Sequence, residues 1–181
     1  MGCGIIMLIE IKDFNNNRLA FPLLDVIAGL IEEKDGAMVS TTAGKIVCNF
    51  ANFTDAADAA FRIHEDERAH DANGAPQIRI SLHDIASTEK SNGLAPELKI
   101  SVKALSFADF GKTVVSASAA ALKTGTYDFI LVSEGGKGEI KFFELVKPSP
   151  RSSSEENTRA LYAQDAGGTL DRWVQLTVGG V

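Results

Sequence analysis

Carboxylate side chains near the amino end of the chain are the first candidates for chemistry. Glu10 stands inside an otherwise apolar run, IIMLIEI, and Asp13 follows three residues later. A charge in an apolar segment is unusual unless it has a partner, and carboxylate oxygens are ligands for hard cations such as Mg²⁺. Glu10 is therefore a candidate metal ligand, although the simpler interpretation is that it reaches solvent or a nearby lysine. Asp13 could add a second carboxylate or belong to a polar turn.

The three histidines could supply acid–base chemistry, but their positions do not favour it. His83 and Asp84 end an alternating segment, QIRISLHDI, where a structural role is the simpler interpretation for His83. His64 and His70 lie in a charged stretch, HEDERAHD, which is typical of a solvated helix face. Their spacing does not place both on one face of a helix, so the sequence predicts no zinc site there.

Hydrophobic periodicity predicts the elements that would position these side chains. A turn of small residues at 42–44 separates two alternating segments, which predicts a β-hairpin over residues 36–50. One helix is predicted over residues 22–34, with Pro22 in its first turn, and another after Thr54, a candidate N-cap. The other predicted elements are strands at residues 5–11, 77–85, 98–105, 127–133 and 140–146, and a short helix of small residues at 116–122.

This order of elements favours an α+β fold. We expect a ferredoxin-like βαββαβ core, with a mixed, mostly antiparallel sheet covered by helices. The composition changes after Pro148 to a Ser-rich stretch typical of a linker. The predicted organisation is one domain over residues 1–147, a linker over 148–158 and an extension over 159–181 that is either helix or strand.

Bulk composition excludes several classes of protein. The net charge of −6 argues against a nucleic-acid partner, and no run of 18 apolar residues is present to span a membrane. Cys3 and Cys48 are the two cysteines, too few for a disulfide framework. Cys48 falls on the apolar side of a predicted strand and is expected to be a small core residue in a reduced, cytoplasmic protein.

Four segments of the chain, in this order, resemble class III adenylate and guanylate cyclases. They are IIMLIEIKDF, then AGKIVCNFANFTDAADAAFRI, then QIRISLHDI, and finally FGKTVVSASAAALKTGTYDFILVSE. They match, in turn, the family's opening strand and phosphate loop, its metal hairpin and helix, a central strand, and the helix and strand that complete the core. The resemblance implies the family's fold and a homodimer or partner chain, because the family's active sites form across a dimer interface.

The resemblance also places the family's catalytic positions on this sequence, where most of the required residues are missing. The first metal carboxylate falls on Glu10, and the second, an aspartate in a Gly-Asp turn, falls on Gly44. The purine-selecting lysine, the asparagine and the transition-state arginine fall on Ser40, Val115 and Ala119. Residues 111–126 contain no asparagine or arginine at all, so a shift in alignment does not restore them.

Three functions are compatible with this pattern. The first is a catalytically inactive cyclase-like domain that needs no cofactor and acts as a dimerising regulatory or protein-interaction module. The second is an active or weakly active cyclase that converts ATP or GTP with Mg²⁺ or Mn²⁺ held by Glu10. The third is a sensor whose phosphate loop binds a nucleotide without turnover. The loop residues are Ile11, Lys12, Asp13, Phe14 and Asn15.

Overall fold

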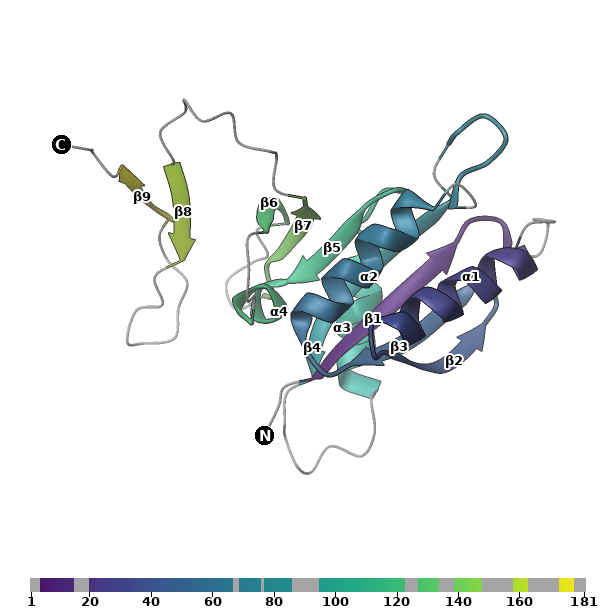
Figure 1. Cartoon of the computed structure of the whole chain (residues 1–181). Helices are drawn as coiled ribbons and strands as arrows, with labels where there is room; N and C mark the ends of the chain where they lie inside the picture. Colours follow the sequence, from purple (N-terminus) through teal and green to yellow (C-terminus); the bar gives the residue numbers. More distant parts are fainter. Residues whose placement is uncertain are drawn as a thin grey trace. The chain divides into compact units, whose positions relative to one another are not determined.

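The computed structural model (Figure 1) describes residues 4–14, 20–66, 69–75, 77–85, 95–122, 127–133, 139–147, 158–162 and 173–177. The chain divides into two compact units, Met1–Lys147 and Pro148–Val181. The second unit holds two antiparallel strands, β8 (Thr158–Tyr162) and β9 (Trp173–Thr177). The segment for which the sequence left helix and strand open therefore contains strands.

A seven-stranded sheet forms the first unit, in the order β2-β3-β1-β4-β5-β7-β6. Its strands are β1 (Gly4–Ile11), β2 (Ala37–Thr42), β3 (Lys45–Phe50), β4 (Ile78–Ile85), β5 (Thr113–Ser116), β6 (Asp128–Ser133) and β7 (Phe142–Val146). Its helices are α1 (Ala20–Glu33), α2 (Phe53–Glu65), α3 (Ala95–Leu105) and α4 (Ala117–Ala121). Strands β4 and β5 run parallel, and the other neighbouring pairs run antiparallel. The predicted α+β class is confirmed.

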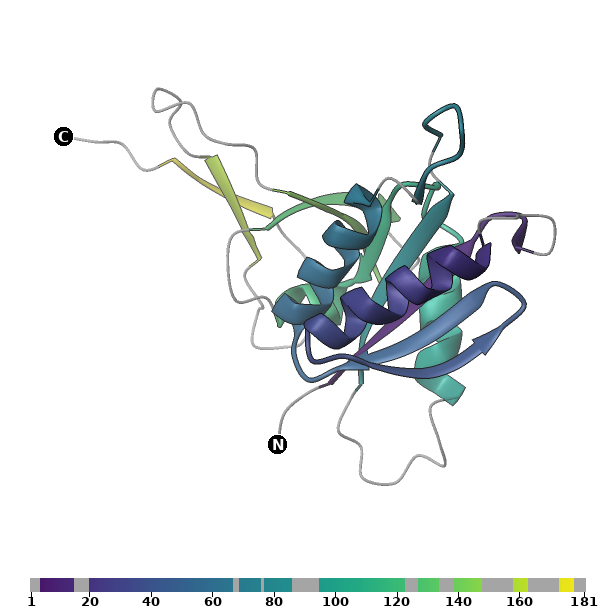
Figure 2. The same ribbon diagram turned by 45° about the vertical axis from the view of Figure 1, so that its right-hand side comes forward.

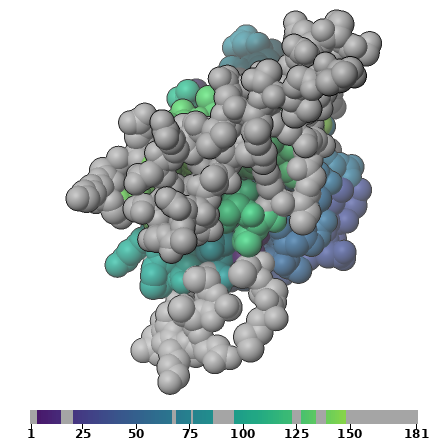
Figure 3. Space-filling model, turned by 90° about the vertical axis from the view of Figure 1, so that its left-hand side faces the viewer, coloured from purple at the N-terminus to yellow at the C-terminus, as the bar shows by residue number. Residues whose placement is uncertain are grey.

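Strands β2, β3, β1 and β4 form the predicted ferredoxin-like core, because α1 follows β1 and α2 follows β3. Helices α1 and α2 cover one face of this sheet (Figure 1, Figure 2), and α3 packs against the other. Seen from the side, blue residues of the α1–α2 layer and teal residues of α3 lie on opposite sides of the first unit (Figure 3). Among the described residues, no helix is both long and apolar enough to cross a membrane.

The central strand β1 is apolar on both sides because both faces are covered. Ile5, Met7 and Ile9 join the core under α1 and α2, whereas Ile6 and Leu8 join the core under α3. A strand buried on both faces loses the usual alternation of apolar and polar residues. Glu10 is the exception in this strand, and it lies near the strand's end, next to the candidate site.

The hairpin β2–β3 turns at Ala43 and Gly44, as predicted. Thr42 pairs with Lys45, so the loop has two residues, and both have positive φ angles of 48° and 79°. This backbone is the type I′ turn that suits the twist of two antiparallel strands. The turn brings Gly44 beside the end of β1.

Three details of the sequence prediction were wrong. Residues 98–105, predicted as a strand, belong to helix α3, where Glu97, Ser101, Ala104 and Leu105 are buried at helical spacing. Strand β5 was not predicted, because only four residues form it between α3 and α4. Helix α2 is capped by Asn52, not by Thr54. The Asn52 side chain accepts a hydrogen bond from the Asp55 amide at 3.0 Å.

Candidate functional site

The site that the sequence predicts lies where β1 ends between the hairpin turn and the start of β4. The Ile11 amide donates a hydrogen bond to the Gly44 carbonyl at 2.8 Å, and the Lys12 amide donates to the Gln77 carbonyl at 2.8 Å. Asp13 adopts a left-handed conformation, with φ of 49°. These contacts hold the start of the predicted phosphate loop against two neighbouring segments.

The Glu10 carboxylate is ion-paired with Arg79, the residue directly opposite it on β4. Glu10 Oε2 accepts hydrogen bonds from Arg79 Nε at 3.0 Å and from Arg79 Nη2 at 2.8 Å. About a quarter of each side chain is exposed, 24% for Glu10 and 26% for Arg79. The partner of the Glu10 carboxylate is therefore this guanidinium group, and not solvent or a nearby lysine.

The arginine is itself fixed by two further contacts. Its Nη1 donates to the Ala108 carbonyl at 3.2 Å, and its guanidinium carbon lies 5.1 Å from the centre of the Phe110 ring. Lys12 Nζ approaches the same ring at 5.7 Å. The segment after α3 thus holds Arg79 in place toward Glu10.

The space beside Gly44 is filled by Phe14. A Cβ atom placed on Gly44 would lie 2.5 Å from the Phe14 Cβ and 3.0 Å from its Cγ. The φ of 79° at Gly44 also disfavours any residue with a side chain. A carboxylate at this position would require both Phe14 and the backbone to move, so Gly44 cannot be replaced by aspartate without rearrangement.

The predicted phosphate-loop residues have different environments. Ile11 is buried in the core, Lys12 and Asp13 are exposed, and Phe14 is half-buried. Phe14 also contacts Phe21 of α1, with ring centres 6.1 Å apart. Asn15 lies outside the described residues. The loop therefore presents one cation, Lys12, and one anion, Asp13, to solvent.

The remaining catalytic positions from the resemblance do not gather polar groups. Ser40 is exposed on β2, while Val115 on β5 and Ala119 on α4 are fully buried in the hydrophobic core. Within the ranges that the structure describes, no three His, Cys, Asp or Glu side chains are grouped to hold a metal ion. The donors around Glu10 and Gly44 thus do not fit a pair of divalent ions.

His83 belongs to a buried polar network that the sequence did not reveal. Its Nδ1 lies 2.8 Å from Ser116 Oγ and 3.3 Å from Asp84 Oδ1. Ser116 also caps α4 by accepting from the Ala119 amide, and Ser118 donates to Asp84. Burial lowers the pKa of His83, against the opposing effect of the nearby Asp84 and Glu97 carboxylates. The network fixes α4 to the end of β4, which supports the structural role predicted for His83.

His64, which the sequence placed on a solvated helix face, is instead half-buried, and both His64 and Cys48 are held in the fold. His64 Nε2 lies 3.0 Å from Thr113 Oγ1, and burial lowers the pKa of His64 to about 4. Cys48 is fully buried, and burial raises the pKa of its thiol to about 12, which keeps it protonated and unreactive. Its predicted place in the core is confirmed.

Arg79 and Phe110 are the site residues that the sequence analysis missed. Pairing the two predicted strands at residues 5–11 and 77–85 in antiparallel register would have placed Arg79 opposite Glu10. Phe110 follows α3, which was predicted as a strand, so no local pattern placed its ring against the guanidinium.

Comparison with known proteins shows similarity in structure and not in sequence. No family model matches the chain, and no curated protein sequence matches it. The guanylate cyclase domain of RhGC from Catenaria anguillulae, solved in complex with GTP, superposes with a TM-score of 0.65 at 14% identity. That match covers 82% of this chain and 98% of that domain.

Two further solved structures give similar matches. The adenylate/guanylate cyclase/hydrolase from Silicibacter pomeroyi has a TM-score of 0.63 at 15% identity, covering 81% of this chain and 98% of that one. The adenylyl cyclase CyaB from P. aeruginosa has a TM-score of 0.59 at 11% identity, covering 82% and 96%. The fold implied by the resemblance is confirmed: this chain has the fold of the class III adenylate and guanylate cyclase catalytic domains.

Proposed function

We propose that this chain is a cyclase-like domain that does not catalyse cyclisation and acts as a regulatory, protein-interaction module. Cyclisation needs a nucleophilic hydroxyl, a pyrophosphate leaving group and, in the two-metal mechanism, carboxylates that hold both ions. It also needs a cation placed where charge develops in the transition state. The observation that carries the proposal is a pair of contacts at the end of β1: Phe14 fills the space beside Gly44, and Arg79 is ion-paired with Glu10.

The magnitude of these losses supports inactivity. Removing one preorganised electrostatic contact costs on the order of 3 kcal/mol, or about a hundred- to a thousand-fold in rate. Here the second carboxylate, the asparagine and the arginine are all absent from the matched positions. The effects of such losses on the rate are not additive, but each loss removes stabilisation of the charge that develops in the transition state.

A cyclase assay on the full chain tests this proposal. The chain is incubated with ATP or GTP and either Mg²⁺ or Mn²⁺, and cyclic nucleotide is measured by chromatography. A guanylate cyclase domain assayed in parallel shows that the conditions support catalysis. We expect no product above the buffer control with either nucleotide. Metal-dependent product that the variant Glu10→Gln abolishes would show instead that the chain is an active cyclase.

A module that works through contacts must bind a second copy or another chain. We propose the cytoplasm as its compartment, because the buried Cys48 thiol requires no oxidising environment. Sedimentation velocity at increasing concentration distinguishes a homodimer from a monomer that needs a partner. A strict monomer that binds no protein would contradict the proposed role, even if the cyclase assay shows no activity.

A further inference from the structure

Strand β6 forms one of the two outer edges of the seven-stranded sheet. It pairs with β7 on its inner side, and none of the described strands pairs with its outer side. The backbone N–H and C=O groups along the outer side of an edge strand are a template for another strand. Six residues form β6, and the four at 129–132 are all apolar, FILV. An apolar edge strand of this kind is a predicted site for pairing with another chain.

Ile130, in the middle of β6, is largely exposed. Its neighbours Phe129 and Leu131 pack against the core under α1 and α2, and Val132 packs against a smaller cluster on the α3 side. Ile130 lies opposite Glu144 of β7, and 55% of it is exposed. An exposed apolar side chain and an open strand edge therefore coincide at one residue.

Strand β2, at the other edge of the sheet, is less suited to pairing. Its second half is polar, with Ser40, Thr41 and Thr42, and its register with β3 shifts between Met38 and Ser40. An irregularity of this kind twists an edge strand away from a partner. Strand β6 also has a register shift, but it lies at Val132 and leaves the first four residues in regular register.

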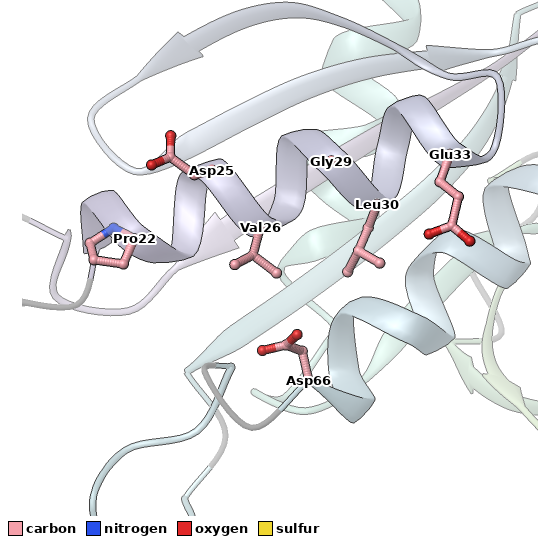
Figure 4. Close-up of a pocket in the computed structure, with 7 residues that line it drawn as sticks. All are labelled: Pro22, Asp25, Val26, Gly29, Leu30, Glu33 and Asp66. Carbon is pink, nitrogen blue, oxygen red and sulfur yellow. The ribbon is translucent and has the colours of Figure 1, made fainter.

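The distribution of charge favours contact at β6 between two copies of this chain. Residues 20–66, which form α1, the hairpin and α2, contain eight acidic and three basic residues. Figure 4 shows three of these carboxylates, Asp25, Glu33 and Asp66, on α1 and at the end of α2. Residues 127–147, which include β6 and β7, contain four acidic and three basic residues. Two copies that each carry a net charge of −6 therefore repel less at their β6 edges than at their α1–α2 faces.

We propose that two copies of this chain pair through β6, antiparallel and related by a two-fold axis at Ile130. An axis perpendicular to the sheet keeps each face of the sheet on its own side, so Ile130 of one copy lies opposite Ile130 of the other. Phe129 then lies opposite Leu131, and Asp128 lies opposite Val132. Each of these cross-strand pairs is apolar or carries a single charge. This inference rests on the proposed function, because it names the partner and the surface of an interaction module.

The antiparallel register keeps the two Asp128 carboxylates apart. Each lies two residues from the axis, so they are about 14 Å from each other along the strands. That distance exceeds the Debye length of about 8 Å at physiological ionic strength. Parallel pairing would bring the same two carboxylates side by side, and like charges on neighbouring strands destabilise a sheet.

Sedimentation velocity of the full chain at increasing concentration tests the proposal. We expect a reversible dimer with a Kd on the order of 10–100 μM, because one strand edge is a small interface. Ile130→Lys places two like charges at the axis and should weaken dimerisation at least about tenfold. The matched control is Val39→Lys, which adds the same charge to the other edge strand at a residue that is 48% exposed. We expect this variant to dimerise like the unmodified chain.

An exchange of charges tests the register. Ile130→Glu alone should dimerise as weakly as Ile130→Lys, because like charges again meet at the axis. An equimolar mixture of the two variants should associate at least about tenfold more tightly than either variant alone. Thermal denaturation checks that each variant is folded. If the charged variants do not fold, Ile130→Thr keeps a residue that favours strands but removes the apolar contact, and it should also weaken dimerisation.

A chain that stays monomeric up to about 500 μM would overturn the inference. Equal weakening by Ile130→Lys and Val39→Lys would also overturn it, as would a mixture that associates no better than its components. Weakening by Val39→Lys alone would assign the interface to β2.

The failure of this inference can be distinguished from the failure of the proposed function. A monomer that binds a different protein would contradict pairing through β6 and leave the proposed function intact. Cyclic nucleotide production would contradict the proposed function without changing the sedimentation results.

Discussion

At the scale of single residues, the pairing of Glu10 with Arg79 decides what this end of the sheet can do. A carboxylate at the end of an apolar strand needs a counter-charge. Arg79 provides it through two hydrogen bonds and is held by the Ala108 carbonyl and the Phe110 ring. A metal ion at Glu10 would have to share the carboxylate with a guanidinium group that is already ordered by three neighbours.

We predict that Arg79→Gln lowers the free energy of unfolding by about 1–3 kcal/mol, because it leaves Glu10 partly buried without a counter-charge. The double variant Glu10→Gln with Arg79→Gln should lose less than the sum of the two single losses, as expected for residues in contact. Urea denaturation of all three variants measures this coupling.

The control for this cycle is Lys147→Gln. Lys147 pairs with Glu65, and more than half of each side chain is exposed, 53% for the lysine and 58% for the glutamate. Exposed pairs contribute less than about 1 kcal/mol. Equal losses from Lys147→Gln and Arg79→Gln would contradict a special role for the Glu10 pair.

Gly44 and Gly74 allow strain and crowding to be separated. Both have positive φ angles, 79° and 77°, but only Gly44 would bring a Cβ against another residue, Phe14. Alanine in a left-handed conformation costs about 1–2 kcal/mol. We predict that Gly44→Ala lowers the free energy of unfolding by about 1–3 kcal/mol more than Gly74→Ala does. Equal losses in thermal or urea denaturation would show that the space beside Gly44 is open.

At the scale of elements, the carboxyl end of α2 is fixed to β5 by a neutral histidine. His64 contacts Thr113, and burial lowers its pKa to about 4, below the ordinary value of 6.5. The folded state therefore binds fewer protons than the unfolded state between these two values. Stability contributed by His64 is complete above the ordinary pKa and declines as the pH falls toward 4.

We predict that acidification from about pH 7.5 to about pH 4.5 removes up to about 3 kcal/mol through His64. His83, whose pKa is also lowered, contributes in the same direction. The variant His64→Gln should show a smaller loss than the unmodified chain in urea denaturation at the two pH values. An identical loss in both proteins would contradict a neutral, buried His64.

Elements with strong hydrophobic periodicity could be predicted from the sequence, whereas the short strand β5 and helix α3 could not. The apolar run of β1, the hairpin turn at Ala43 and Gly44, and helix α2 all carry local signals that tertiary contacts reinforce. Helix α3 was mistaken for a strand because Leu98, Ile100 and Val102 alternate with polar residues. Its buried side instead follows Glu97, Ser101 and Leu105, a pattern that becomes visible once the neighbouring sheet is known.

At the scale of the whole molecule, the sheet order explains which parts of the site the sequence could reach. Glu10 and Gly44 were identified because each belongs to a segment with its own motif. Arg79 was not, because it reaches Glu10 only when β4 pairs with β1 across 69 residues of chain. Phe14 occupies the space beside Gly44, and this contact likewise depends on how the segment after β1 packs against the hairpin.

At the end of β1 in this cyclase-like fold, the Phe14 ring fills the space beside Gly44 and Arg79 is ion-paired with Glu10. The most direct test is a titration of the full chain with Mn²⁺, with and without a non-hydrolysable GTP analogue, in which electron paramagnetic resonance measures free Mn²⁺. We predict no stoichiometric binding up to about 1 mM Mn²⁺, because the site lacks the paired carboxylates that hold two ions. Two Mn²⁺ ions bound per chain, and lost in Glu10→Gln, would contradict the account.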